Sequence, residues 1–588
     1  MRNLSLNHKP KQDVIVLKDV IFITPTSSTN LKDEIFGTLT LASLLKYADV
    51  SVKIKRFFQF GDVNDFDTFI DAAEKEIMSD SPKIVSFYTR CDIYHVMLKI
   101  AERIKAVSPQ TYIVFGGPQA DACAKETILA FDYVDFVCCG EGEKTIVPLF
   151  KSLLNGKPDL SVDGLVYKKD GDAVINPRPA LITDFDSLPF ADFSLWTDIE
   201  RTAKDIYALP IDIGRGCPFN CIFCSTKSFW ERKYRLKSAE RIIEEIKLIH
   251  NTFNITHFKF MHDMFTMNKE AVTLLCEKIK ELDFKITWSC SARADCLTKE
   301  LIDTMADAGL DRIFIGVESG SPRMQKVIKK NLKLDKAYEI IKYISEKGLI
   351  ISASYIYGFP DETPEDLSQT IYSFLLVSGY KGVQTWCHRC AFFPGTEIEK
   401  VHGHELTESS VYSDLSGDFG ATACAELINA HPKIFPQYRE YNTPLRTSLR
   451  YFDYFLWILR KIPSVYMYLS RYYTPTTMLN MYYDWEKANI DLLENLDKTV
   501  LDKDVADYLL ENDKFIHTFE KDERYPILKD VVRFYSDYVL REKVGFLGVY
   551  GFIVDDYFNR TKIEDYEKGI SRVTVSPDRK VKLNKIKL

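Results

Sequence analysis

Three cysteines in one short segment are the residues of this sequence best suited to chemistry. Cys217, Cys221 and Cys224 have the spacing Cys-x3-Cys-x2-Cys, with Gly214-Arg-Gly216 before them and Phe223 before the last cysteine. Three thiolates can bind three irons of a [4Fe-4S] cubane and leave the fourth iron open for a substrate. A structural zinc site is the alternative, but zinc needs a fourth ligand and none lies nearby in the sequence. We therefore predict an iron–sulfur cluster with one open iron.

The cysteines directly follow the first of six predicted strands that alternate with amphipathic helices. The strands are expected at residues 207–213, 258–261, 287–291, 313–316, 350–355 and 382–386. Six strand–helix units indicate a partial (β/α)6 barrel of the TIM type, which we place at residues 206–402. The loops after the strands carry the chemistry in such barrels.

This motif and its place in the barrel resemble the radical S-adenosylmethionine (radical SAM) superfamily. The resemblance implies that S-adenosyl-L-methionine (SAM) binds the open iron through its amino and carboxylate groups. Electron transfer then cleaves SAM to an adenosyl radical. An external electron donor such as flavodoxin or ferredoxin is implied as well, and Phe223 is expected in the same cofactor-binding loop.

Five further residues match positions of the family one at a time. Asp263, after the second strand, resembles the residue beside the methionine amino group, and Arg293, after the third, the one near the methionine carboxylate. Glu318 and Ser319 end the fourth strand and resemble the ribose-contacting motif. Ser354 lies in the fifth-strand region that faces adenine. A solvated glutamate or a salt-bridged arginine is the alternative for such residues.

The sixth strand ends in Cys387-His-Arg-Cys390, which points toward the mouth of the barrel. Such a pair could bind metal, donate a hydrogen atom or form a redox couple, and Cys390 is our candidate catalytic thiol. Ordinary packing is the alternative, because no second Cys-x2-Cys lies at zinc-finger spacing.

Residues 1–150 alternate apolar runs with helical patterns, which predicts a doubly wound parallel sheet. Two glycine-rich turns directly follow predicted strands, where glycine lets a ligand approach the backbone. The turns contain Gly116, Gly117, Pro118 and Gln119 in the first, and Gly140, Glu141 and Gly142 in the second. A plain tight turn is the alternative for each.

This region resembles the cobalamin-binding domain that precedes many radical SAM cores. Gln119 replaces the histidine often seen after Gly-Gly-Pro, and no Asp-x-His-x-x-Gly motif offers an axial histidine to cobalt. The resemblance therefore implies cobalamin without a protein histidine ligand of that kind. The alternative is a domain that keeps the fold but has lost the cofactor.

Two further regions complete the predicted α/β organisation. Residues 151–205 form a linker with a small hairpin, and residues 403–588 form a mainly helical C-terminal domain rich in aromatic residues. We expect these rings to pack in a core, and some of them could line a substrate pocket.

The composition restricts the function classes. With 77 basic and 84 acidic residues the formal charge is −7, so no basic excess indicates nucleic-acid binding. Thirteen cysteines without an export signal favour reduced thiols and a cytoplasmic protein. The most apolar stretch, residues 451–473, is interrupted by charges, so we expect no membrane span.

The whole arrangement resembles the class B, cobalamin-dependent radical SAM methylases. It implies C-methylation of an unactivated carbon in a peptide or natural-product substrate. An alternative uses the N-terminal domain only as a scaffold, with epimerisation, crosslinking or cyclisation as the reaction. A non-enzymatic corrin or iron–sulfur sensor ranks last, because it would not need the residues grouped around the cluster.

Overall fold

The computed structural model describes residues 19–25, 36–60, 65–196, 208–409, 413–416, 419–496, 508–510, 512–519, 526–535, 546–552, 568–575 and 581–587. The chain divides into two compact units. The first comprises Met1–Ile182, Leu188–Thr202 and Phe419–Ala430, and the second Thr183–Ser187, Ala203–Asp418 and His431–Leu588.

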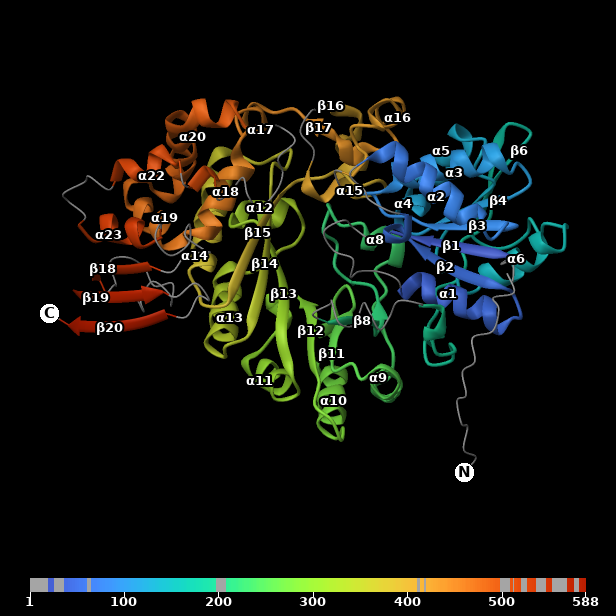
Figure 1. The fold of residues 1–588 in the computed structure, drawn as a ribbon, viewed down its shortest axis with the longest axis horizontal. Helices are drawn as coiled ribbons and strands as arrows, with labels where there is room; N and C mark the ends of the chain where they lie inside the picture. Colours follow the sequence, from blue (N-terminus) through green and yellow to red (C-terminus); the bar gives the residue numbers. More distant parts are fainter. Residues whose placement is uncertain are drawn as a thin grey trace. The chain divides into compact units, whose positions relative to one another are not determined.

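The first unit is built on a seven-stranded sheet in the order β2-β1-β3-β4-β5-β6-β7 (Figure 1). The strands are β1 (Val20–Thr24), β2 (Val52–Arg56), β3 (Ile84–Tyr88), β4 (Tyr112–Gly116), β5 (Phe136–Cys138), β6 (Leu165–Lys169) and β7 (Asp172–Ile175). The helices between the parallel strands are α1 (Phe36–Tyr47), α2 (Phe66–Met78), α3 (Tyr94–Val107), α4 (Pro118–Ala122) and α5 (Ala124–Ala130), followed by α6 (Ile146–Leu154). The strands from β1 to β5 are parallel, as the sequence predicts.

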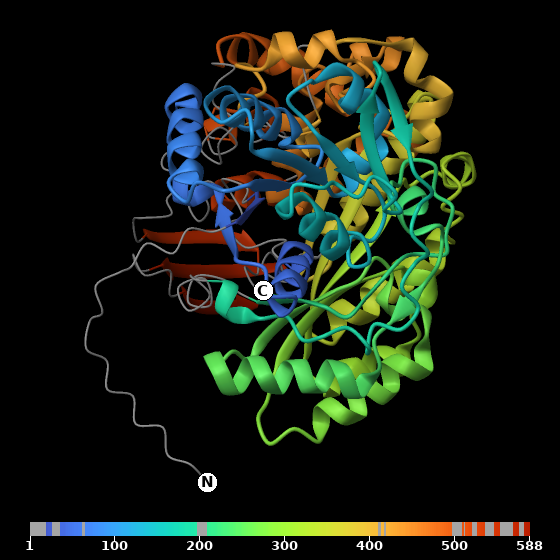
Figure 2. The same cartoon turned by 90° about the vertical axis from the view of Figure 1, so that its right-hand side faces the viewer.

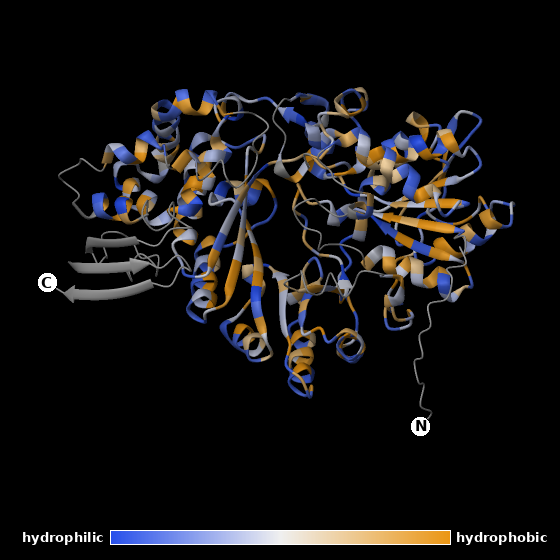
Figure 3. Ribbon diagram, viewed as in Figure 1, coloured by the Kyte–Doolittle hydropathy of each residue, from blue (hydrophilic) through white to orange (hydrophobic). Residues whose placement is uncertain are grey.

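Strands β1 and β3 are almost entirely apolar and buried, and β1 is largely orange in Figure 3. Continuous apolar strands are typical of parallel sheets that are covered on both faces. The strand order reverses between β1 and β3, and the crevice at such a reversal is the usual ligand site of an open α/β sheet. The hairpin expected within residues 151–205 forms β6 and β7, which extend the sheet with antiparallel pairing.

The second unit contains a six-stranded sheet in the order β15-β14-β13-β12-β11-β8, in which every pair is parallel. Its strands are β8 (Leu209–Asp212), β11 (His257–Met261), β12 (Thr287–Ala292), β13 (Leu310–Glu318), β14 (Ile350–Tyr357) and β15 (Val383–Arg389). The main helices are α9 (Ala239–Phe253), α10 (Lys269–Lys280), α11 (Lys299–Asp307), α13 (Leu334–Glu346) and α14 (Pro364–Ser378), which lie along one side of the strands in Figures 1 and 2. The predicted α/β fold with a partial barrel is confirmed.

Local sequence signals begin these helices. The side chain of Ser238 caps α9, and Thr363 with Asp366 forms a capping box at α14. The faces that the helices cover are apolar and fully buried, as at Ile313 and Ile351. Helix capping and apolar burial together position the strand ends of the barrel.

The C-terminal part of the second unit is mainly helical. Its helices include α17 (Pro444–Thr447), α18 (Phe452–Lys461), α19 (Pro463–Leu469), α20 (Met478–Glu494), α22 (Lys514–Thr518) and α23 (Pro526–Tyr535). Phe455 and Trp485 belong to a buried aromatic cluster, with ring centroids 5.3 Å apart, so these rings form a core. Within the described residues, no helix is both long and apolar enough to cross a membrane.

An antiparallel three-stranded sheet also lies in this part and was not expected from the sequence. It consists of β18 (Phe546–Phe552), β19 (Lys568–Val575) and β20 (Val581–Lys587).

Candidate active site

The loop that carries Cys217, Cys221 and Cys224 begins at the carboxyl end of β8. The short strand β9 (Gly214–Arg215) pairs with β10 (Arg235–Leu236), and helix α8 (Thr226–Trp230) follows the last cysteine. Gly216 has a φ of 94°, and a Cβ there would overlap the carbonyl oxygen of Lys233. Its backbone N–H donates to Oδ2 of Asp263 at 2.7 Å, so the acid after β11 holds the start of the loop.

The three thiols lie in this loop with partial exposure to solvent. Burial raises the pKa of Cys217 to about 11 and also raises the pKa of the other two. The cationic side chains of Lys330 and Arg293 oppose the rise at Cys221, since they favour the thiolate. Within the described part of the chain, no three metal-ligating side chains are close enough to hold a single ion. In a cubane each thiolate binds its own iron.

A group of buried charges lies beside Cys221. Nη1 of Arg293 is 4.0 Å from the Cys221 sulfur, and its guanidinium carbon lies 3.8 Å from the ring centroid of Phe219. The same guanidinium donates to the backbone oxygen of Lys330 at 2.8 Å. The Lys330 side chain is 7% exposed and its Nζ lies 2.8 Å from Oε1 of Glu318. The structure thus brings Arg293 and, through Lys330, Glu318 close to the cysteine loop.

Sequence reasoning missed Lys330. It is the second lysine of a Lys-Lys pair after α12 (Pro322–Val327), and nothing in the sequence distinguishes a buried lysine from its exposed neighbour Lys329. Only its pairing with Glu318 reveals the role, since a buried ammonium needs a partner.

His262 and Asp263 follow β11 and differ in role. Nδ1 of His262 accepts from the N–H of Met264 at 2.8 Å, so Nε2 carries the proton and donates to the Arg235 oxygen at 3.1 Å. Burial lowers the pKa of His262 to about 4, which keeps the ring neutral. His262 therefore ties backbone segments together and leaves no nitrogen for a ligand. Burial raises the pKa of Asp263, whose Oδ2 already binds Gly216.

Ser319 and Ser354 are both buried in the barrel. The hydroxyl of Ser319 lies 3.0 Å from that of Thr370 on α14, so it fastens the loop after β13 to a helix. Ser354 pairs in register with Gly316 on β13 and Trp386 on β15. Ser354 thus lies on β14, between β13 and β15.

Cys390 lies in an apolar cluster rather than in an open site. The cluster includes Met324, Phe359 and Phe392, and Phe223 of the cysteine loop packs against it. Burial raises the pKa of Cys390 to about 12, so the thiol stays protonated. This position suits the packing alternative better than a redox role.

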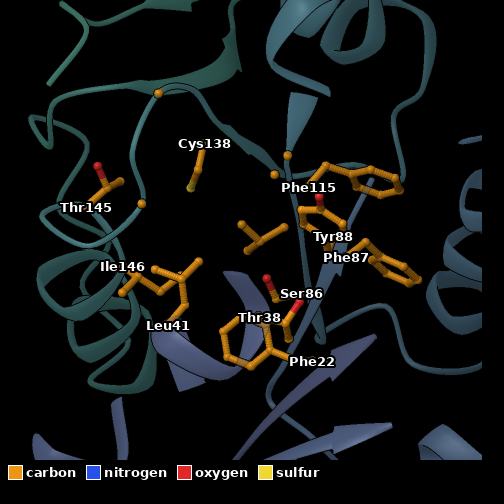
Figure 4. Close-up of a pocket in the computed structure, with 15 residues that line it drawn as sticks. Phe22, Thr38, Leu41, Ser86, Phe87, Tyr88, Phe115, Cys138, Thr145 and Ile146 are labelled. Carbon is orange, nitrogen blue, oxygen red and sulfur yellow. The ribbon is translucent and has the colours of Figure 1, made fainter. Parts of the chain in front are cut away.

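In the first unit, a cavity lies at the carboxyl ends of β1, β3, β4 and β5 and encloses about 490 Å³ of space, part of it open to solvent (Figure 4). Four glycines of the two predicted turns line it, namely Gly116, Gly117, Gly140 and Gly142. Pro118, Gln119 and Glu141 of the same turns are not among the lining residues. Gln119 and Glu141 are instead buried, and Glu141 accepts a hydrogen bond from the Ile182 backbone.

The fold requires glycine at one of the positions beside the cavity but not at another. Gly117 has a φ of 99°, and a Cβ there would lie 2.7 Å from the Thr89 oxygen, so the fold itself requires glycine. At Gly116 the nearest atom to a Cβ would be the Cys138 oxygen at 3.8 Å, so the fold has room for a side chain. A substitution at Gly116 would therefore fill part of the cavity without disturbing the fold.

Sequence reasoning missed the other cavity residues. They are Phe22, Thr38, Leu41, Ser86, Phe87, Tyr88, Val114, Phe115, Cys138, Thr145 and Ile146. Several end strands or begin helices, which is the signal that would have found them. Oγ1 of Thr38 is buried and has no hydrogen-bond partner among the described residues. A mostly apolar cavity with one unsatisfied hydroxyl is suited to an organic ligand.

Asp366 stabilises the loop that carries Glu318. It accepts from the Ser321 hydroxyl at 2.5 Å, from Nε of Arg323 at 3.1 Å and from the Thr363 hydroxyl at 2.6 Å. Burial alone would raise the pKa of Asp366, but these bonds outweigh it and lower the pKa to about 2. Because the folded pKa lies below the ordinary value, the stabilisation is complete above about pH 4 and is lost as the pH falls toward 2.

We therefore predict that Asp366→Asn lowers the free energy of unfolding by about 1–3 kcal/mol at pH 7. Urea unfolding of the cluster-free chain, followed by circular dichroism, measures the loss, and the exposed Glu365→Gln is the control. The difference between wild type and variant should shrink between about pH 4 and pH 2. A difference that stays constant down to pH 2 would contradict the assigned network.

Comparisons with known proteins agree with this geometry. Residues 211–372 match the radical SAM superfamily. The chain is 30% identical over 329 residues to an uncharacterised methyltransferase of Pyrococcus horikoshii, which covers 54% of this chain and 72% of that protein. It is 25% identical over 308 residues to an anaerobic magnesium-protoporphyrin IX monomethyl ester cyclase of Rubrivivax gelatinosus, covering 51% of this chain and 55% of the cyclase.

Among solved structures, OxsB, a cobalamin-dependent SAM radical enzyme with aqua-cobalamin bound, has the same fold. The TM-score is 0.58 at 16% identity, over 89% of this chain and 84% of OxsB. The cysteine loop lies within the matched residues 211–372, and the Pyrococcus horikoshii relative is covered over 72% of its length. These findings indicate the same family. The chain belongs to the radical SAM superfamily and is a radical SAM enzyme with the fold of the cobalamin-dependent members.

Proposed function

We propose that this enzyme is a cobalamin-dependent radical SAM methyltransferase that methylates an unactivated carbon of a peptide or natural-product substrate. The observation that carries the proposal is the buried group Arg293, Glu318 and Lys330 beside the cysteine loop. The methyltransferase relative and the cavity of the first unit support it.

Within the barrel, Cys217, Cys221 and Cys224 would hold the cluster. When bound, the cluster supplies one electron to the sulfonium of SAM, which yields the adenosyl radical. Arg293 and Lys330 provide positive charge for the methionine carboxylate, because both are buried beside Cys221. Asp295 and the backbone oxygen of Lys330 hold Arg293 in place, and Glu318 holds Lys330.

The acids have complementary roles in the proposal. The remaining oxygen of Asp263 would face the methionine amino group, while Oδ2 keeps the loop in place. Glu318 would contact the ribose from a backbone with a φ of 69°, a strained conformation for this residue. Ser354 and Phe223 would complete the SAM environment from β14 and the cysteine loop. Cys390 takes no part in the proposed reaction, because it is buried in an apolar cluster.

In the first unit, the residues present fit cobalamin. The cavity opens at the switch point of the sheet, Gly116 and Gly140 bring backbone close to it, and Thr38 offers an unsatisfied hydroxyl. The cavity would hold one arm of this large cofactor rather than the whole molecule. When bound, cobalamin supplies a transferable methyl group.

The proposal includes its partners. We propose a flavodoxin or ferredoxin as electron donor. The formal charge of −7 supports the absence of a nucleic-acid partner, and the thirteen cysteines support the cytoplasm as compartment. The domain limits proposed are 1–150, 151–205, 206–402 and 403–588.

A second candidate function is cyclisation, or another radical rearrangement, without methyl transfer. The relative from Rubrivivax gelatinosus is named a cyclase, and this similarity favours it. In that case the first unit would serve as scaffold.

Reconstituted enzyme separates the two candidates. With cobalamin, SAM and reductant, the methyltransferase should form S-adenosylhomocysteine as well as 5′-deoxyadenosine, because one SAM gives its methyl and another gives the radical. Chromatography of the nucleoside products measures both. Formation of 5′-deoxyadenosine alone by cobalamin-loaded enzyme would favour the second candidate.

Each of Cys217→Ala, Cys221→Ala and Cys224→Ala should lose most of the iron per chain and all SAM cleavage, since a cubane held by two thiolates is not retained. Iron analysis and the 5′-deoxyadenosine assay provide the readout. Cys390→Ala is the matched control and should keep its iron. Full iron in any of the triad variants would refute the ligand assignment.

Gly116→Val should reduce bound cobalt at least about tenfold, because the side chain enters a cavity whose walls have room for it but not for a ligand as well. Iron content and SAM cleavage should stay unchanged. Ala130→Val, at an exposed position of α5, is the control. Wild-type cobalt content in Gly116→Val would remove the cavity from the proposal.

A further inference from the structure

The strands β13, β14 and β15 present one covered face and one open face. Successive residues alternate between the two. Ile313, Ile351 and Val383 are buried on the side of the helices, which pack against these strands. On the opposite face, Phe314 and Trp386 remain 43% and 42% exposed. Large exposed aromatic side chains inside a barrel indicate a binding surface.

A row of paired residues joins this surface to the proposed SAM site. Gly316 pairs with Ser354, and Ser354 pairs with Trp386. Two strand spacings of about 4.8 Å place the Trp386 backbone about 10 Å from Gly316. A Cβ on Gly316 would lie 2.8 Å from Nζ of Lys330, so the row begins at the Glu318–Lys330 pair. A small substrate that contacts Trp386 would therefore extend to the proposed SAM site.

Arg460 covers part of Trp386. It comes from α18, which contacts β15, and its guanidinium carbon lies 4.0 Å from the Trp386 ring centroid. The side chain is half-buried, and no carboxylate of the described residues lies within ion-pair distance. Burial lowers the pKa of Arg460, so its surroundings disfavour an uncompensated charge.

Nearby buried arginines differ from Arg460 in this respect. Arg389 and Arg446 both bind Oε1 of Glu440, at 2.8 and 3.4 Å. The protein thus supplies the shared acid Glu440 to these two, whereas Arg460 has an aromatic ring as its partner among the described residues. An external anion would complete the environment of Arg460.

We propose that Trp386 and Arg460 form the substrate subsite for a carboxylate attached to a flat, apolar group. The edge of the guanidinium binds the carboxylate through two parallel hydrogen bonds, while the apolar part lies against Trp386 and Phe314. A single guanidinium compensates a monoanion, which favours a carboxylate over a phosphate dianion. The reacting carbon then lies about 10 Å from the carboxylate. This inference rests on the proposed function and names its substrate class.

A pair of probes tests the subsite without knowledge of the substrate. 2-Naphthoate and its neutral analogue 2-naphthamide are titrated against the cluster-loaded, SAM-bound full chain, with ligand-observed NMR as the readout. Wild type should bind the carboxylate at least about tenfold more tightly than the amide. Arg460→Gln should bring the ratio to about one, whereas the exposed Arg450→Gln should preserve it. Trp386→Leu should weaken both probes together.

Equal binding of the two probes to wild type, or a preference retained in Arg460→Gln, would overturn the subsite. Arg460→Lys keeps the charge without the forked geometry and replaces Arg460→Gln if that variant does not fold. It should keep only part of the preference. Iron content and 5′-deoxyadenosine formation are measured on the same samples. Their loss in wild type would contradict the proposed radical chemistry, whereas failed discrimination with both intact contradicts only the subsite.

Discussion

The hydrogen bond from the backbone N–H of Gly216 to Asp263 joins the start of the cysteine loop to the end of the neighbouring strand. It is possible because β8 and β11 are parallel neighbours, so their carboxyl ends lie at the same edge of the sheet. Gly216 adopts a backbone that a side chain would block. The cysteine loop, whose own side chains are only partly buried, is therefore positioned by backbone geometry. The same edge collects Arg293 from β12 and Glu318 from β13.

Much of the barrel could be predicted from the sequence because its strands are apolar, short and separated by amphipathic helices. The positions of Asp263, Arg293 and Glu318 followed from their places after strands. Lys330 could not be predicted, since its burial depends on a pairing with Glu318 that only the folded chain forms. Cys390 illustrates the opposite case. Its motif indicates chemistry, but three-dimensional packing surrounds the thiol with apolar side chains.

The first unit shows the limits of turn motifs. Both glycine-rich turns lie at the predicted strand ends, yet only their glycines line the cavity. Gln119 and Glu141 are buried in the protein instead, where Gln119 lies near the Cys123 sulfur and Glu141 binds the Ile182 backbone. The C-terminal sheet was missed because apolar and polar residues alternate only over residues 581–584, and the next apolar residue, Ile586, breaks the period of two. The aromatic helical pattern of the preceding segment obscured this signal.

The central claim is that this chain holds a cluster with one open iron and presents it to SAM. Electron paramagnetic resonance of the reduced, reconstituted enzyme tests it directly, because ligation of the open iron changes the electronic environment of the cluster. The account predicts a [4Fe-4S]⁺ signal in wild type that changes shape when SAM is added. A cluster signal that SAM leaves unchanged would contradict it.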